Sequence, residues 1–154
     1  MRHTREEIIE QTIREYELLD DLVSPLTGEE WLRLVPRPAS KEPWTVKDAL
    51  AHIALRKADY AALIVGDPRP AEQFNTSPTR GFRLMLQHWR EQPAEQVLAF
   101  HRQVQQQVLI ALRSAPEEAL AAAVGKQEWP NDLVSHSSHH RVHDIKKALE
   151  TGEK

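Results

Sequence analysis

The sequence predicts an all-α protein, an antiparallel four-helix bundle with short accessory helices in the loops. Long segments carry apolar residues at spacings of three and four, which is the period of an amphipathic helix, and segments rich in proline and glycine separate them. No stretch of useful length shows the alternation of a β-strand. A length of 154 residues with 40% hydrophobic residues suits a single compact domain, to which we assign residues 1–154.

The first half of the chain predicts two of the long helices. The first covers residues 4–23, and its expected buried stripe is Ile9, Ile13, Tyr16, Leu19 and Val23. Residues 29–35 form a short helical turn, and a connector with three prolines follows. The second long helix covers residues 45–65, because Thr45 and Asp48 have the spacing of a capping box, in which each side chain accepts from the other's backbone amide.

The second half of the chain predicts the other two long helices. A loop is expected at 69–81 and a short helix at 82–90. The third long helix covers 93–113 and begins with a proline, whose missing amide hydrogen costs nothing in the first turn. A short Ala-rich helix at 117–124 precedes the last long helix at 133–150.

Composition excludes several classes of function. Twenty Lys and Arg against 23 Asp and Glu give a net charge of −3, and no basic block predicts a nucleic-acid surface. The absence of cysteine excludes disulfides and thiolate ligands. The charged first residues do not resemble a signal peptide, and no run approaches the roughly 18 apolar residues of a membrane span. We therefore expect a cytoplasmic protein without a membrane or nucleic-acid partner.

Histidines concentrate in the last predicted helix. Four of the eight lie within eight positions: His136, His139, His140 and His143. Imidazoles one helical turn apart commonly hold a transition metal, and the cluster contains two such pairs. On a helical wheel of about 100° per residue, His139 and His143 border the apolar stripe, whereas His136 and His140 lie nearly opposite the core. We predict that His139 and His143 face a site between helices, with the other pair as the alternative.

A metal site needs a further ligand. A divalent ion usually has at least three protein ligands, and sites in helical bundles are assembled from facing helices. His52 is the best third ligand because it lies on another long helix, while His88 and His101 lack a comparable context. The competing interpretation is that His52 is an ordinary half-buried histidine and that the last helix presents a solvated polar face.

Two segments carry a resemblance to a known family. Residues 43–53, Pro-Trp-Thr-Val-Lys-Asp-Ala-Leu-Ala-His-Ile, resemble the second-helix signature of the DinB-like (damage-inducible) superfamily of metal-binding four-helix bundles. Residues 139–143, His-His-Arg-Val-His, are similar to the histidine pattern of that family's final helix. The resemblance implies an up-down-down-up bundle, often dimeric, in which His52, His139 and His143 bind zinc, nickel or a similar divalent ion.

The resemblance also implies a range of activities. Some members use low-molecular-weight thiols to transfer or isomerise small electrophiles, and others act as hydrolases or self-resistance proteins. We therefore expect a metal-dependent hydrolase or a thiol-dependent transferase acting on a small molecule, with catalytic residues unassigned. The thiol would come from a small molecule, because the chain has no cysteine. The alternative is a non-catalytic stress or interaction protein with a vestigial or absent metal site.

Residue type and position predict which side chains surround the expected site. Carboxylates suited to orient the histidines through their second nitrogens are Asp48, Asp59 and Asp144. Asp48 is the weakest of these because its spacing from Thr45 favours a helix cap. The expected pocket lining is the loop 69–81 with Trp44, Phe82 and Trp129.

Overall fold

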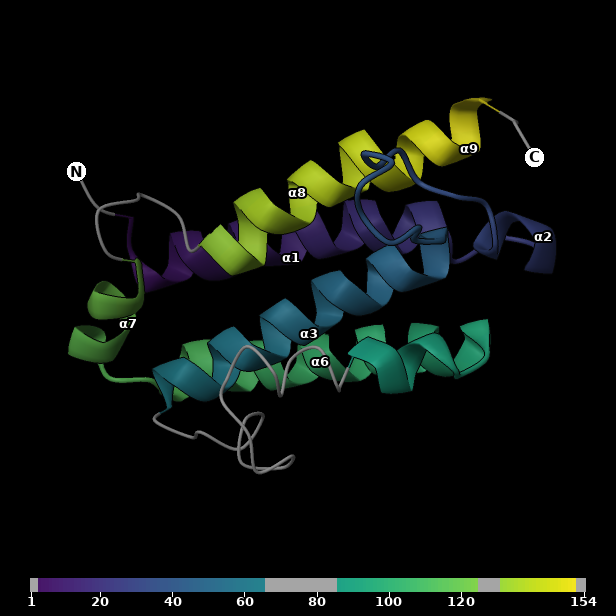
Figure 1. Ribbon diagram of the computed structural model, residues 1–154. Helices are drawn as coiled ribbons and strands as arrows, with labels where there is room; N and C mark the ends of the chain where they lie inside the picture. The colour runs from purple at the N-terminus through teal and green to yellow at the C-terminus, as the bar shows by residue number, and fades with distance from the viewer. Residues whose placement is uncertain (1–2, 66–85, 125–130, 152–154) are drawn as a thin grey trace.

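Four long helical segments form a bundle in the computed structural model, which describes residues 3–65, 86–124 and 131–151 (Figure 1). They are α1 (Arg5–Val23), α3 (Val46–Ile64), α6 (Ala94–Ser114) and a last helix over 131–151. Two short helices, α2 (Gly28–Trp31) and α7 (Glu117–Val124), lie at opposite ends of the bundle. The described residues contain no strand beyond an isolated bridge between Leu34 and Thr45. The predicted all-α class is confirmed.

The last helix is continuous but not uniformly α-helical. Its successive segments are η1 (Asn131–Ser135), α8 (His136–His140), η2 (Arg141–Lys146) and α9 (Lys147–Thr151), and both η segments are π-helical. A π-helix has more residues per turn than the 3.6 of an α-helix, and short π segments are frequent at functional sites. The direction in which a side chain of this helix points therefore departs from a uniform helical wheel.

The bundle has the expected up-down-down-up order. Figure 1 shows α1 and the last helix running in one direction and α3 and α6 running in the opposite direction. Helix α3 begins as predicted, because the Thr45 side chain accepts from the amide of Asp48 at 3.1 Å and the Asp48 carboxylate accepts from the amide of Thr45 at 3.0 Å. Asp48 is thus a helix cap, the role that its spacing favoured.

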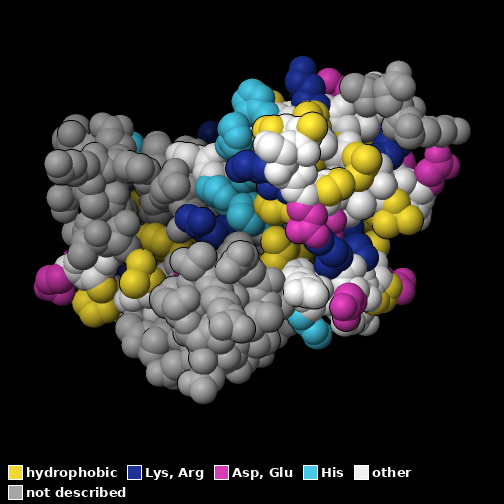
Figure 2. Space-filling model, in the orientation of Figure 1, with side chains coloured by type: hydrophobic (Ala, Val, Ile, Leu, Met, Phe, Trp, Pro, Cys, Tyr) yellow, Lys and Arg dark blue, Asp and Glu magenta, His cyan; other side chains and the backbone are white. Residues whose placement is uncertain are grey.

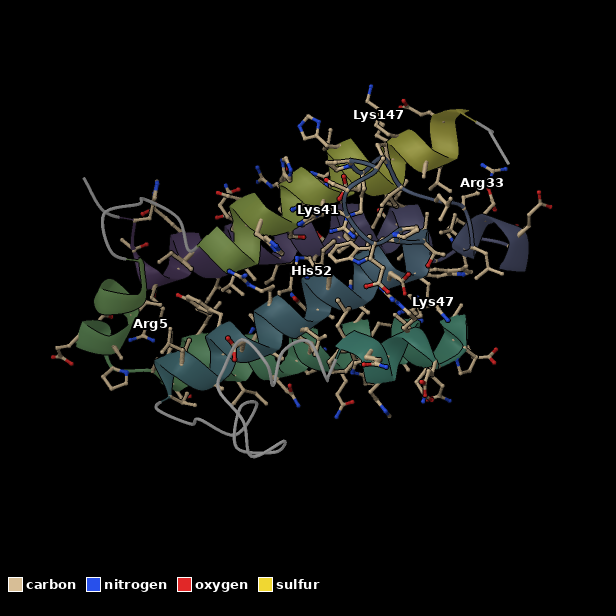
Figure 3. All side chains as sticks on the ribbon, viewed as in Figure 1. Arg5, Arg33, Lys41, Lys47, His52 and Lys147 are labelled. Carbon is tan, nitrogen blue, oxygen red and sulfur yellow. The ribbon has the colours of Figure 1, made fainter. Side chains whose placement is uncertain are left out.

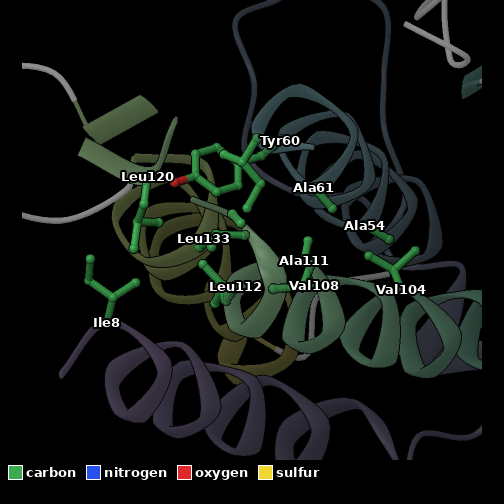
Figure 4. Packing of buried hydrophobic residues seen from close by; sticks show 12 residues of the cluster. Ile8, Ala54, Tyr60, Ala61, Val104, Val108, Ala111, Leu112, Leu120 and Leu133 are labelled. Atoms are coloured by element: carbon green, nitrogen blue, oxygen red, sulfur yellow. The ribbon is translucent and has the colours of Figure 1, made fainter. Parts of the chain in front are cut away.

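The buried apolar side chains form two clusters, one toward each end of the bundle. The cluster at the α7 end, drawn in Figure 4, includes Ile8, Ala54, Tyr60, Val104, Val108, Leu112, Leu120 and Leu133. The cluster at the other end includes Leu19, Val23, Trp31, Val46, Leu50, Ile53, Val97 and Ile145. Each long helix contributes to both clusters, which explains why the amphipathic pattern extends over its whole length.

Apart from the cap residue Asp48, the buried polar side chains lie between the two clusters, away from the ends of the long helices. We call this set the polar layer: Thr12 and Glu15 on α1, Lys57 on α3, His101 and Gln105 on α6, and Ser137 on α8. Burying polar and charged groups destabilises a fold unless they find partners. The layer is therefore where interactions other than packing decide the arrangement of the helices.

Several sequence predictions concern residues that lie partly or wholly outside the described ranges. The short helix predicted at 82–90 is helical over its described part, residues 86–90. The loop 69–81, Phe82 and Trp129 lie outside the described residues. Among the helices that the structure describes, none is both long enough and apolar enough to cross a membrane.

Candidate metal centre

Three histidines from two facing helices converge beside the polar layer. Each of His52 on α3 and His136 and His140 on α8 offers one ring nitrogen, and these nitrogens all lie within 4.8 Å of one another. Figure 3 shows His52 in the space between α3 and the last helix. We call these three residues the inner cluster. It is the one group of this kind found among the described residues.

The closest contact in the inner cluster joins two nitrogens of the same kind. Nε2 of His52 lies 3.0 Å from Nε2 of His136. Two imidazole lone pairs repel at this separation, so a proton or a cation must lie between them. A tetrahedral ion with metal–nitrogen bonds of about 2.0–2.1 Å would hold its ligand nitrogens roughly 3.3 Å apart. The distance between His52 and His136 is a few tenths of an ångström below this value, so these two nitrogens fit as ligands of one divalent ion after a small shift.

Contacts to neighbouring residues orient the outer edge of the cluster. Nδ1 of His140 lies 2.6 Å from Oδ2 of Asp144, which turns the opposite nitrogen of that ring toward the site. Such a carboxylate contact is the usual way to fix the tautomer and orientation of a metal-binding histidine. Asp144 was one of the three carboxylates predicted for this role. Of the other two, Asp48 caps α3 and Asp59 is exposed on the same helix.

An aromatic and a cationic side chain cover the site from the connector before α3. The Trp44 ring lies 4.8 Å from the ring of His52 and 6.4 Å from that of His140, measured between centroids. The guanidinium carbon of Arg37 lies 3.8 Å from the centre of the Trp44 ring, a cation–π contact. Trp44 therefore lies beside the inner cluster, where the sequence prediction of the pocket lining had placed it.

The imidazoles of His52 and His136 are held in their neutral form. Burial, followed by the charges of His136 and His140, lowers the pKa of His52 from 6.5 to about 3. Burial, followed by the charges of His140 and Arg56, lowers the pKa of His136 to about 3 as well. Charged imidazoles are disfavoured in a low-dielectric environment surrounded by cations. Neutral rings keep the lone pair that a metal ion requires.

A buried carboxylate on α1 anchors the helix that carries His136 and His140. Ser137 Oγ donates to Oε2 of Glu15 at 2.9 Å, and the Arg141 guanidinium donates to both oxygens of Glu15 at 2.9 to 3.2 Å. Ser137 and Arg141 each directly follow one of the two histidines in the chain. Because bidentate charge-assisted hydrogen bonds are strong and directional, Glu15 sets the rotation of α8.

Lys57 adds a positive charge to the polar layer below the site. Its side chain is 2% exposed, and no hydrogen-bond partner for Nζ is found among the described residues. Burial lowers its pKa from 10.5 to about 8, against the opposing effect of Glu15. The Lys57 charge also contributes to the lowered pKa of His136.

The pair predicted to face the bundle points to solvent instead. His139 and His143 are exposed, whereas His136 and His140 are half-buried, so the predicted orientation of the two pairs is wrong. The structure brings His52 together with His136 and His140 and does not bring it together with His139 and His143. The ligand set His52, His139 and His143 stays a prediction about metal binding, and the geometry favours the alternative pair.

The π-helical segments explain this difference. Leu133 and Ile145 are both fully buried although twelve residues separate them. At 100° per residue they would point about 120° apart. The extra residues per turn in η1 and η2 reduce the average rotation, which keeps Leu133, Ser137 and Ile145 on the same side of the helix. The uniform wheel therefore assigned the histidines to the wrong faces.

Comparison with known families agrees with the geometry. Residues 11–142 match the model of the DinB superfamily. The chain belongs to the DinB superfamily. Searches of curated proteins and of solved structures gave no match. The matched residues include all three members of the inner cluster, and His143 follows directly after the last matched residue.

This DinB superfamily member also has site residues that the sequence prediction missed. Glu15, Ser137, Arg141 and Lys57 were not assigned a role. Their residue types are common on exposed helix faces, and hydrophobicity alone cannot separate them from solvated residues. The sequence does contain a signal that Glu15 is buried. Glu15 lies at helical spacing from Ile8 and Leu19, which are both buried.

The donor set of this DinB superfamily chain suits a borderline divalent ion. Three imidazoles without a thiolate or a direct carboxylate ligand suit zinc, nickel or a similar ion better than calcium or magnesium, which prefer oxygen. His52, His136 and His140 would hold the ion, with Asp144 orienting His140. The arrangement is a three-histidine cluster suited to bind a metal ion.

Proposed function

We propose that this DinB superfamily protein binds zinc or nickel through His52, His136 and His140 and acts on a small molecule as a metal-dependent hydrolase or thiol-dependent transferase. The observation that carries the proposal is the convergence of three ring nitrogens within 4.8 Å from two helices. Three neutral imidazoles leave a divalent ion its full charge and an open position, which lowers the pKa of a water or thiol ligand and polarises a substrate oxygen.

The surroundings support a substrate or cosubstrate that carries negative charge. Arg37 and Arg56 both contribute positive charge at His52, and Arg37 stacks on the neighbouring Trp44. Positive side chains beside a site raise the local concentration of anions and stabilise negative charge that develops during reaction. A thiolate or a carboxylate-bearing small molecule would benefit from both cations. A transferred thiol must be exogenous because the chain has no cysteine.

The first experiment measures the metal content of the protein as purified. We expect about one zinc or nickel ion per chain, lost in His52→Ala and in His136→Ala/His140→Ala and kept in His139→Ala/His143→Ala. The last variant is the matched control, because it also removes two histidines at the same spacing from the same helix. Wild-type protein that binds no divalent ion would exclude the metal-dependent function and leave the non-catalytic helical bundle.

The second experiment separates the two reactions. Metal-loaded protein is incubated with activated esters and with small electrophiles, each with and without a low-molecular-weight thiol. Turnover of the electrophile only when thiol is present identifies a transferase, and ester turnover without thiol identifies a hydrolase. Arg37→Ala should raise KM for anionic substrates more than it lowers kcat if this cation binds the substrate in its ground state.

A further inference from the structure

A second pair of histidines lies on the outer side of the same helix. His139 and His143 are exposed, and their ring centroids are 4.9 Å apart with an interplanar angle of 46°. We call them the outer pair. Imidazoles on successive turns can ligate one ion together, and first-row divalent metals such as nickel, copper and zinc accept imidazole readily. Solvent supplies the remaining ligands at an exposed position.

The outer pair is continuous with the inner cluster. Ring centroids are 5.4 Å apart between His139 and His140, 4.5 Å between His140 and His136, and 4.8 Å between His136 and His52. The five rings thus form a series from solvent to the half-buried site. Figure 2 shows histidine side chains gathered as a band on one face of the molecule.

We propose that His139 and His143 form a second divalent-metal site, which captures an ion from solvent and delivers it through His140 to the inner cluster. Bonds from the ion to the outer pair break as bonds to His140, His136 and His52 form, and the charge of the ion does not change. The proposal goes beyond the proposed function, because metal binding at the inner cluster alone requires no outer pair. Two ligands instead of three make the outer site the weaker one, by roughly tenfold or more.

Calorimetric titration of the full, chelator-treated chain with Zn²⁺ tests the existence of the outer site. Wild-type protein should show a tight and a weaker class of site. His139→Ala/His143→Ala should lose only the weaker class, and His136→Ala/His140→Ala only the tight class. His88→Ala is the control because His88 is exposed on another part of the chain, beside Trp89, and it should keep both classes. Saturation of the wild type by one ion per chain would overturn the proposal.

Delivery is tested by the rate of loading. Stopped-flow absorbance follows Co²⁺ entering the inner cluster at ion concentrations below saturation of the outer site. Loading of His139→Ala/His143→Ala should be slower by roughly tenfold, with the same final absorbance, because the outer pair raises the effective concentration of the ion at the inner cluster. Equal rates in this variant and in His88→Ala would overturn delivery.

Failure of this inference and failure of the proposed function have different signatures. If the tight class disappears only in His136→Ala/His140→Ala and no weaker class is seen, the inner site stands and the outer site is rejected. If the tight class disappears in His139→Ala/His143→Ala and survives in His136→Ala/His140→Ala, the ligand assignment is reversed and both proposals are rejected.

Discussion

The inner and outer histidine pairs of the last helix have the same residue type and the same spacing but different surroundings. His136 and His140 are half-buried beside His52, whereas His139 and His143 are exposed. Burial, followed by the charges of His140 and Arg56, lowers the pKa of His136 to about 3, and the burial and the Arg56 charge arise from packing against other helices. Spacing within one helix identifies a pair that can bind metal, and contacts with other helices decide which pair has a third ligand.

The contacts responsible for this difference lie one residue away from the histidines. Ser137 and Arg141 both bind Glu15 of α1, and this turns the preceding residues, His136 and His140, toward α3. His139 and His143 lie on the same helix but point away from these contacts. A polar anchor on a neighbouring helix thus selects the functional face, a role usually attributed to the apolar stripe.

The largest expected difference between the pairs is in stabilisation by metal. Zn²⁺ at about a thousandfold over its Kd should raise the free energy of unfolding by about 4 kcal/mol in the wild type. His139→Ala/His143→Ala should keep this gain, and His136→Ala/His140→Ala should lose it. Denaturant unfolding with Zn²⁺ and with chelator measures both. The reverse result would support His139 and His143 as ligands, as the uniform helical wheel predicts.

Removal of the anchor tests why the inner pair faces inward. Glu15→Ala should lower the free energy of unfolding by about 3 kcal/mol, because it leaves the half-buried charge of Arg141 without its carboxylate. Glu17→Ala, at an exposed position of the same helix, is the control and should change stability by less than about 0.5 kcal/mol. Chemical denaturation without metal measures the effect. Similar losses in the two variants would contradict the anchoring role of Glu15.

The buried charge of Lys57 in the polar layer is expected to lower the free energy of unfolding. Lys57→Met should stabilise the metal-free protein by about 2 kcal/mol near neutral pH, because it replaces a buried ammonium that makes no hydrogen bond with described residues by an apolar side chain of similar size. Lys147→Met, at an exposed position, should have little effect. A destabilised Lys57→Met variant would show that the ammonium makes a favourable interaction in the polar layer.

The pH dependence of this effect has a defined sign. Burial lowers the pKa of Lys57 from 10.5 to about 8, so the unfolded chain binds more protons than the folded protein between these pH values. The stability contributed by Lys57 therefore rises as pH increases through this window. The difference in the free energy of unfolding between Lys57→Met and the wild type should therefore be largest below pH 8 and disappear toward pH 10.5. Unfolding at a series of pH values measures it.

The smallest expected effect concerns the orientation of one inner ring. Asp144→Asn should weaken metal binding about tenfold, or about 1.4 kcal/mol, because the amide holds His140 Nδ1 less strongly than the carboxylate does. Glu150→Gln, at an exposed position of the same helix, is the control. Competition with a chromophoric chelator measures the affinity. Equal affinities in the two variants would show that packing alone orients His140.

Much of the fold could be predicted from local patterns. The limits of the four long helices agree within about two residues because caps, prolines and apolar periodicity act over short distances along the chain, whereas the short turn predicted at 29–35 already ends at Trp31. The buried face of α1 was less accurate. The predicted residues Ile9 and Ile13 are only half-buried, while Thr12 and Glu15 are buried. Hydrophobic patterns shift by one residue when a helix buries polar side chains, since the pattern counts these as exposed.

The sequence by itself determined the all-α class, the family, the capped start of α3 and the concentration of histidines in the last helix with His52 as their partner. Each of these depends on residue type and short-range spacing. Only the tertiary structure decided which histidines meet. The π-helical segments change the rotation of the last helix, and the hydrogen bonds of Ser137 and Arg141 to Glu15 hold that rotation across more than 120 positions of sequence. The spacing of residues within one helix does not specify where the neighbouring helix lies. His136 and His140 could therefore be identified as the inner pair only from the packed structure.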